Sequence, residues 1–175
     1  MRKNPVLATI LSVMFLVLSV LSMIIPGKAG EITAMFLLPL FFVLLCGILT
    51  GAALPAAVGV ISPLVAFLIT GNGRFVADVL PFALALSGAG IMAGILYGRM
   101  RTVVGATEAA LLFFVVLYGV AKMILMLAIA ESYKATDFLG TIFVRQLPGV
   151  LLCAVGVPLV SVLLRQIGIL KVLRD

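Results

Sequence analysis

The uncharged stretch from Ile32 to Thr70 reads ITAMFLLPLFFVLLCGILTGAALPAAVGVISPLVAFLIT, and it decides how the chain folds. As a single helix rising about 1.5 Å per residue it would be about 58 Å long, whereas the hydrocarbon core of a bilayer is only about 30 Å thick. The stretch must therefore turn back on itself. Gly51 suits the end of one helix and Pro55 the first turn of the next, so we predict a hairpin of two membrane helices, 34–50 and 54–70.

The composition of the whole chain agrees with a membrane location. Of its 175 residues, 65% are hydrophobic and 10% are charged, and the mean hydropathy is +1.40. A soluble domain is roughly 45–50% apolar and about 25% charged, so this chain has more apolar surface than a soluble core could bury. Soluble enzymes, nucleic-acid readers and secreted disulfide scaffolds are therefore disfavoured. The net charge of +6 comes from residues at the ends of apolar runs, where membrane topology explains it.

The charged residues divide the rest of the sequence into further apolar runs. We predict an all-α membrane protein: a six-transmembrane-helix bundle forming a single integral membrane domain over residues 1–175. The first run could instead be a cleaved signal peptide, but it is longer than the usual apolar region of such peptides, and no small-x-small cleavage site follows it. The predicted spans are 5–25, 34–50, 54–70, 79–98, 106–130 and 147–167.

Six spans place both termini on the same side of the membrane, and the positions of Lys and Arg indicate which side. With both termini cytoplasmic, seven basic residues face the cytoplasm and four lie in outer loops, with Lys122 left inside a span. Cytoplasmic loops carry an excess of Lys and Arg. We therefore expect a multi-pass protein of a bacterial inner or plasma membrane with both termini cytoplasmic.

The sequence lacks the residue sets that most catalytic and metal sites need. It contains no His, and its two cysteines, Cys46 and Cys153, sit inside apolar runs. It shows no glycine-rich phosphate loop with a lysine and no paired carboxylates at one depth. We predict no catalytic residues, no metal site and no cofactor in this chain, and therefore a protein that is not an enzyme.

Small residues recur at helical spacing in two predicted spans. Gly90, Gly94 and Gly98 form a stripe on one face, and Gly47 and Gly51 form another. Small residues let helices in lipid approach closely, because lipid supplies no hydrophobic drive for association. Packing within the bundle is the favoured interpretation, and homodimerisation through the glycine stripe is the alternative.

Lys122 is the main candidate for a functional side chain, because a charge inside a bilayer is costly and tends to have a role. Tyr118 and Met126 lie one helical turn on either side of it. Two structural interpretations stay open: the amine extends to the outer headgroups, or it pairs with Asp78 or Glu131. The functional interpretation is a cation that receives an anionic ligand in an outward-facing cavity.

The remaining candidate residues lie near the same predicted outer surface. Arg145 can anchor the last span or bind a carboxylate in a forked geometry, and two glycines give the loop 71–78 the flexibility of a gate. The full set of predicted substrate-binding residues is Lys122, Arg145, Asn72, Arg74, Asp78, Tyr118, Met35, Phe36 and Gln146.

From the hairpin to the fourth span the sequence resembles the substrate-binding S components of energy-coupling factor (ECF) vitamin transporters. The length, the six spans and both ends inside extend the resemblance over the whole chain. The residues that carry it are Leu38-Pro39-Leu40 through Gly47 and Gly51, Ala57-x-Gly59-x-x-Ser62-Pro63, Ile69-Thr70-Gly71 and Gly90-x-x-x-Gly94-Ile95-Leu96-Tyr97.

The resemblance implies a six-helix bundle with a vitamin-sized pocket near the outer surface, closed by loops 26–33 and 71–78. It also implies a first helix that docks on a coupling transmembrane subunit through an Ala-x-x-x-Ala type motif. Ala8 and Ser12 occupy those two places, with Ser instead of the second Ala. The implied partners are this coupling subunit and two ATPase subunits, which would use the ATP.

We therefore expect an S component that captures a small vitamin or related precursor at the outer face. The excess of Lys122, Arg145 and Arg74 over Asp78 suggests a carboxylate on that substrate, as in pantothenate, biotin or a nicotinate-like acid. One alternative is a membrane scaffold of cell-wall assembly similar to the MreD family. The other is a small carrier or channel that works by itself.

Overall fold

The computed structural model describes residues 5–25, 36–71, 74–128 and 146–166. Within these residues the secondary structure is helical, with short turns and no strand. The elements are α1 (Pro5–Ile24), α3 (Leu38–Thr50), α4 (Ala53–Thr70), the π-helical turn η1 (Phe75–Val79), α5 (Leu80–Met100), α6 (Val103–Ala128) and α8 (Leu147–Gln166).

Five of these segments are long and apolar enough to cross a membrane, which indicates a helical multi-pass membrane protein. Most observed bounds lie within one to three residues of the predicted spans. The second span is shorter than predicted: residues 36 and 37 form a turn, and α3 has only 13 residues, about 20 Å of helix. Residues 34 and 35 lie outside the described part of the chain.

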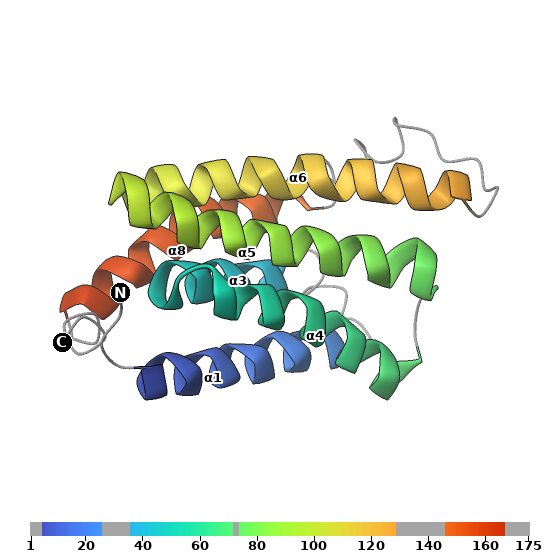
Figure 1. The fold of residues 1–175 in the computed structure, drawn as a ribbon, viewed down its shortest axis with the longest axis horizontal. Helices are drawn as coiled ribbons and strands as arrows, with labels where there is room; N and C mark the ends of the chain where they lie inside the picture. The colour runs from blue at the N-terminus through green and yellow to red at the C-terminus, as the bar shows by residue number, and fades with distance from the viewer. Residues whose placement is uncertain (1–4, 26–35, 72–73, 129–145, 167–175) are drawn as a thin grey trace.

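The short helix α3 is the centre of the bundle. It lies against α1, α4, α5 and α8, and in Figure 1 it runs between α1 and α5. Leu40, Leu44 and Ile48 are fully buried, and so are residues on its other faces such as Val43 and Leu49. A helix that is apolar all round is expected to be enclosed by other helices, and this one is.

The turn between α3 and α4 lies where the sequence predicts it. Gly51 ends α3 with a φ of 88°, a positive value that glycine adopts without strain, and its N–H donates to the carbonyl oxygen of Gly47. Helix α4 begins two residues later, with Pro55 in its first turn.

The glycine stripes bring backbones together inside this chain. A Cβ added at Gly47 would lie 2.5 Å from the carbonyl oxygen of Gly90, and one added at Gly94 would lie 2.6 Å from the carbonyl carbon of Gly51. A Cβ at Gly98, the third glycine of the stripe, would meet no atom within 4 Å. Gly90 and Gly94 thus serve the contact of α5 with α3 and α4, as the favoured interpretation predicts.

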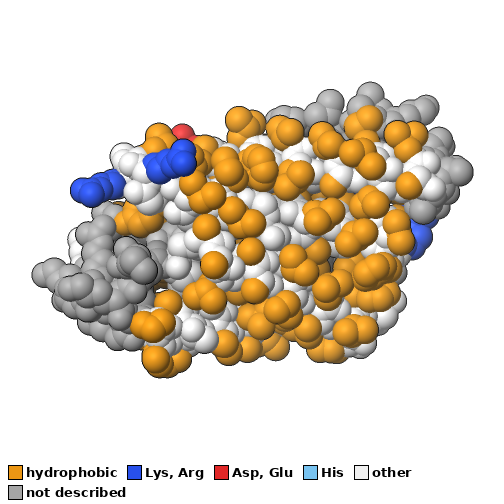
Figure 2. All heavy atoms as spheres, viewed as in Figure 1, with side chains coloured by type: hydrophobic (Ala, Val, Ile, Leu, Met, Phe, Trp, Pro, Cys, Tyr) orange, Lys and Arg blue, Asp and Glu red, His pale blue; other side chains and the backbone are white. Residues whose placement is uncertain are grey.

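The surface of the helical bundle is apolar along its sides. Figure 2 shows hydrophobic side chains over the middle of the visible face and basic side chains at its two ends. On α1 the outward residues are large and apolar, among them Val6, Ile10 and Leu21, each more than half exposed. This distribution fits a lipid-facing belt with charged groups at the membrane surfaces.

Candidate functional site

Lys122 is the last of three side chains that lie in a row on one face of α6. Phe114, Tyr118 and Lys122 follow one another at intervals of one helical turn. The rings of Phe114 and Tyr118 are stacked, with centroids 5.8 Å apart and an angle of 11° between the planes. The Lys122 Nζ atom lies 5.7 Å from the centroid of the Tyr118 ring, within the range of a cation–π contact.

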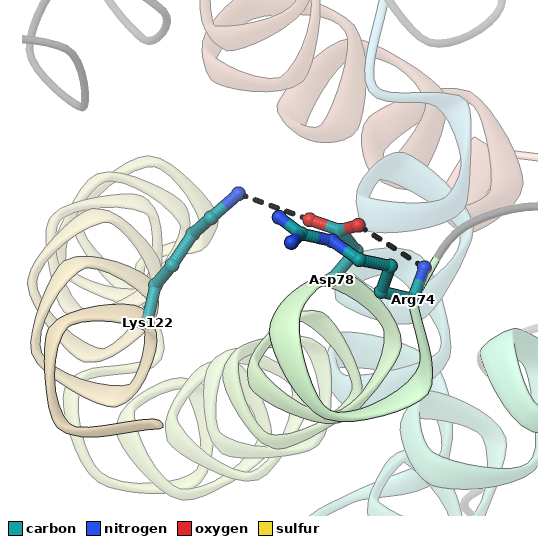
Figure 3. A network of polar contacts seen from close by, with 3 residues as sticks. All are labelled: Arg74, Asp78 and Lys122. Atoms are coloured by element: carbon teal, nitrogen blue, oxygen red, sulfur yellow. Dashed lines mark hydrogen bonds and ion pairs between the residues drawn. The ribbon is translucent and has the colours of Figure 1, made fainter. Parts of the chain in front are cut away.

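Asp78 of η1 faces this row and binds the lysine. The Lys122 Nζ atom lies 3.3 Å from Asp78 Oδ1, while the backbone N–H of Arg74 donates to Asp78 Oδ2 over 3.2 Å. Figure 3 shows the two contacts and the Arg74 side chain, which points toward the same corner. Asp78 is thus one of the two lysine partners left open by the sequence, and the other, Glu131, lies outside the described residues. We call Lys122, Asp78 and Arg74 the charged corner.

The two members of the ion pair differ in their exposure to solvent. The Lys122 side chain is 15% exposed and the Asp78 side chain is 43% exposed. A buried charge needs a counter-ion more than an exposed one does, because water no longer solvates it. The amine therefore depends on Asp78 more than Asp78 depends on the amine.

The π-helical turn that carries Asp78 follows from the local sequence. Pro81 has no N–H to donate to the carbonyl of Ala77, so the regular ladder is interrupted at the start of α5. The Leu80 N–H donates to the Phe75 carbonyl in the wider π pattern, and the Asp78 N–H donates to the Arg74 carbonyl over 2.8 Å. Isolated π turns of this kind are frequent at functional sites.

An aromatic cluster lies beneath the charged corner. Phe82 of α5 meets Phe114 and Tyr118 edge-on, with centroid distances of 6.1 and 5.9 Å. Phe114 is 1% exposed and belongs to the main core. Tyr118 was predicted from the sequence and Phe82 and Phe114 were not, although the one-turn spacing of Phe114, Tyr118 and Lys122 indicates that they share one face of α6.

The structure thus brings four of the predicted binding residues together: Lys122, Asp78, Arg74 and Tyr118. Phe36 lies in the turn before α3, and Gln146 lies directly before α8, with a buried side-chain oxygen that has no hydrogen-bond partner among the described residues. Neither belongs to the charged corner. The remaining three, Met35, Asn72 and Arg145, lie outside the described residues.

The predicted docking pair on α1 faces inward. Ala8 and Ser12 are only 5% and 6% exposed. The Ser12 hydroxyl donates to the Ala8 carbonyl over 2.8 Å and lies 3.5 Å from the Cys46 sulfur of α3. The small residues of α1 therefore accommodate α3, and a partner could contact them only after α1 separates from α3.

Within the described residues, no group of three or more Cys, Asp or Glu side chains is placed to hold a metal ion. The charged corner offers different chemistry, namely cations beside aromatic rings at one end of a helical bundle. Such a group can receive an anion with an apolar body. Comparison of the chain with protein-family models, curated proteins and solved structures gives no match.

Proposed function

We propose that this chain is a solute-binding membrane subunit that captures a small carboxylate-bearing compound at the outer face of a bacterial plasma membrane. The observation that carries the proposal is the charged corner, where a largely buried lysine of α6 meets Asp78 and the Arg74 side chain. The charges of these three side chains sum to one positive charge. A monocarboxylate would balance that charge.

The position of the corner supports a role in ligand capture. An ion pair that served only to hold helices together would be expected between stable helical segments, but Asp78 lies in a single π turn that follows a loop. Intramembrane charges at such irregular backbone commonly mark solute and ion sites. The partly buried rings of Tyr118, beside the amine, and of Phe82 supply a surface for the apolar part of a ligand.

The proposed orientation follows from the basic residues at the other end of the bundle. Arg99 and Arg101 lie where α5 turns into α6, opposite to the charged corner. An excess of Arg at this turn favours the cytoplasm, which places Lys122 near the outer surface. Six spans with both termini cytoplasmic complete this proposed topology.

On the basis of its sequence resemblance, we further propose that the chain is an ECF S component, with a vitamin or related precursor as substrate. Its partners would be a coupling transmembrane subunit and two ATPase subunits, which hydrolyse ATP outside this chain. Because Ala8 and Ser12 contact α3, docking through them would require α1 to move. Bulky residues at both positions should then disturb the fold as well as co-purification.

Native mass spectrometry of the purified protein, followed by binding measurements, tests the proposal. We expect a retained carboxylate compound, and Lys122→Gln should weaken its binding by about tenfold to a hundredfold, since a charge-assisted contact is lost. Arg99→Gln, which removes a cation at the far end of the bundle, is the matched control and should leave binding unchanged.

Three outcomes would contradict the proposal. If Lys122→Gln binds the compound as tightly as the wild type does, the charged corner is not the binding site. Recovery of cell-wall assembly proteins without any ATPase would favour the scaffold alternative. Transport by this chain alone in liposomes would favour an autonomous carrier.

A further inference from the structure

Resting on the proposed function, we infer that Asp78 is a built-in competitor of the ligand: its carboxylate occupies Lys122 in the empty site, and the carboxylate of an incoming ligand replaces it. One anion thereby replaces another on the same amine, which makes Asp78 a determinant of affinity and of the selectivity for anions.

The geometry of the pair suits exchange. The 3.3 Å separation of Lys122 Nζ and Asp78 Oδ1 is longer than the roughly 2.7–2.9 Å of a strong charge-assisted hydrogen bond. The contact also joins α6 to a single π turn, in which the Val79 N–H reaches the Arg74 carbonyl only at 3.4 Å. A long contact to a weakly bonded turn is easier to break than one between two stable helices.

The difference in exposure decides which partner leaves. Asp78 is 43% exposed, so water can solvate its carboxylate, and its second oxygen keeps the Arg74 N–H. Lys122 is 15% exposed, so water solvates its amine less than it solvates the Asp78 carboxylate, and the amine gains more from a neighbouring anion. A ligand carboxylate on Lys122 satisfies both groups, because the lysine stays paired and Asp78 turns to water.

Simultaneous binding of both carboxylates to the amine is less favourable. Two carboxylates on one ammonium group would stand within a few ångströms of each other, and like charges at that distance repel strongly in a partly buried site. A neutral analogue of the ligand gains no such exchange, since it brings no charge to replace Asp78. The site should therefore discriminate between an acid and its amide.

The consequence is a testable increase in affinity on removing Asp78. If Asp78 occupies the amine about nine-tenths of the time, it blocks an incoming carboxylate in about nine-tenths of the empty sites, and the apparent affinity is reduced about tenfold. Asp78→Asn keeps an oxygen for the Arg74 N–H but removes the competing charge. It should bind a monocarboxylate about tenfold more tightly than the wild type.

Benzoate is a suitable probe, because its ring can pack against the partly buried rings of Phe82 and Tyr118, and benzamide is its neutral counterpart. The apparent dissociation constant follows from the rise of the thermal unfolding temperature with probe concentration. We expect the constant for benzoate to fall about tenfold in Asp78→Asn and to stay unchanged in Glu108→Gln. The latter is the matched control, since Glu108 is an exposed carboxylate at the other end of α6. Benzamide should stabilise none of the three proteins.

A second measurement uses the wild type and covers the case in which the variant does not fold. Saturating benzoate should speed amide hydrogen exchange in residues 75–79, because the turn loses its tether to α6, while exchange around Glu108 stays constant. The inference is overturned if Asp78→Asn binds benzoate equally or less tightly, if benzoate binds neither protein, or if exchange in the turn slows. These outcomes are distinct from failure of the proposed function, which is judged by the retained compound and by Lys122→Gln.

Discussion

The two ends of the helical bundle are held together by opposite means. Where α3 turns into α4, glycines of α3 and α5 place backbone against backbone, with Gly47 against Gly90 and Gly94 against the Gly51–Ala52 peptide. At the other end, large side chains fill the space between α5 and α6, and one ion pair ties η1 to α6. Helices whose backbones touch cannot shift without clashes, whereas side chains can change rotamers and partners.

This difference suggests a division of roles between a fixed end and an adaptable end. A ligand must displace existing contacts when it enters, and side-chain contacts near solvent are the ones that exchange at low cost. The proposed binding residues lie at the adaptable end. The following variants test how far the two ends differ.

The largest effect is expected at the fixed end, for Gly94→Leu. A Cβ at this position would lie 2.6–2.7 Å from backbone atoms of Gly51 and Ala52, which cannot move aside as a side chain can. We expect loss of the folded, monodisperse protein in detergent, measured by size-exclusion chromatography and thermal unfolding. Gly98→Leu, with no atom within 4 Å of its Cβ, should fold normally. If the two variants fold equally well, the backbone contact of Gly94 does not hold this end of the bundle together.

A smaller effect is expected for Phe82→Ala, which removes two edge-on ring contacts beneath the charged corner. Each such contact contributes about 0.5–1.5 kcal/mol, so we expect a loss of about 1–3 kcal/mol in the free energy of unfolding in mixed micelles. Leu112→Ala is the control, because Leu112 of α6 is 68% exposed. If both substitutions cost the same, the aromatic cluster does not stabilise this end.

A further test compares two serines on the inward face of α1. Ser12→Ala removes the bond to Ala8 and the contact with Cys46, and should cost about 0.6 kcal/mol, an average value for polar contacts between membrane helices. Ser19 is fully buried, and its hydroxyl has no partner among the described residues. Ser19→Ala should therefore be neutral or stabilising. A larger loss for Ser19→Ala than for Ser12→Ala would contradict these contacts.

A small effect on folding is also expected from the ion pair itself. Because Asp78 is 43% exposed, a double-mutant cycle of Lys122→Gln and Asp78→Asn should give a coupling of no more than about 1.3 kcal/mol, the value for a pair formed about nine-tenths of the time, and salt should reduce it further. Unfolding in mixed micelles at low and high salt measures it. A coupling of several kcal/mol would mean that the ion pair holds the bundle together. It would contradict the view that contacts at this end exchange at low cost.

Much of the helical pattern was predictable from the sequence, because charges and glycines mark where apolar helices end. The Gly51 turn and the inward use of Gly90 and Gly94 both followed from residue type alone. The start of α3 was not predictable in this way. Residues 34–37 are as apolar as those that follow, so hydropathy contains no boundary there, and Leu37 nevertheless adopts a left-handed conformation with a φ of 48°.

The candidate site was predictable only in part. Its charged members stood out, since charges are rare in apolar spans, but the sequence alone did not show that Lys122 contacts Asp78. Phe82 could not be identified because phenylalanine is common in membrane helices, and its role depends on which face of α5 meets α6. The inward orientation of Ala8 and Ser12 could not be predicted from the sequence either, because small residues suit contacts within a chain and between chains alike.

The length of α6 connects the site to the thickness of the membrane. Its 26 residues amount to about 39 Å of helix, longer than a hydrocarbon core of about 30 Å, and Lys122 lies about 28 Å from its first residue. With Val103 at one edge of the hydrocarbon core, the amine would lie near the opposite edge, between acyl chains and headgroups. A thicker bilayer would draw it into hydrocarbon and a thinner one would expose it, so hydrophobic mismatch would set how strongly this lysine needs an anion.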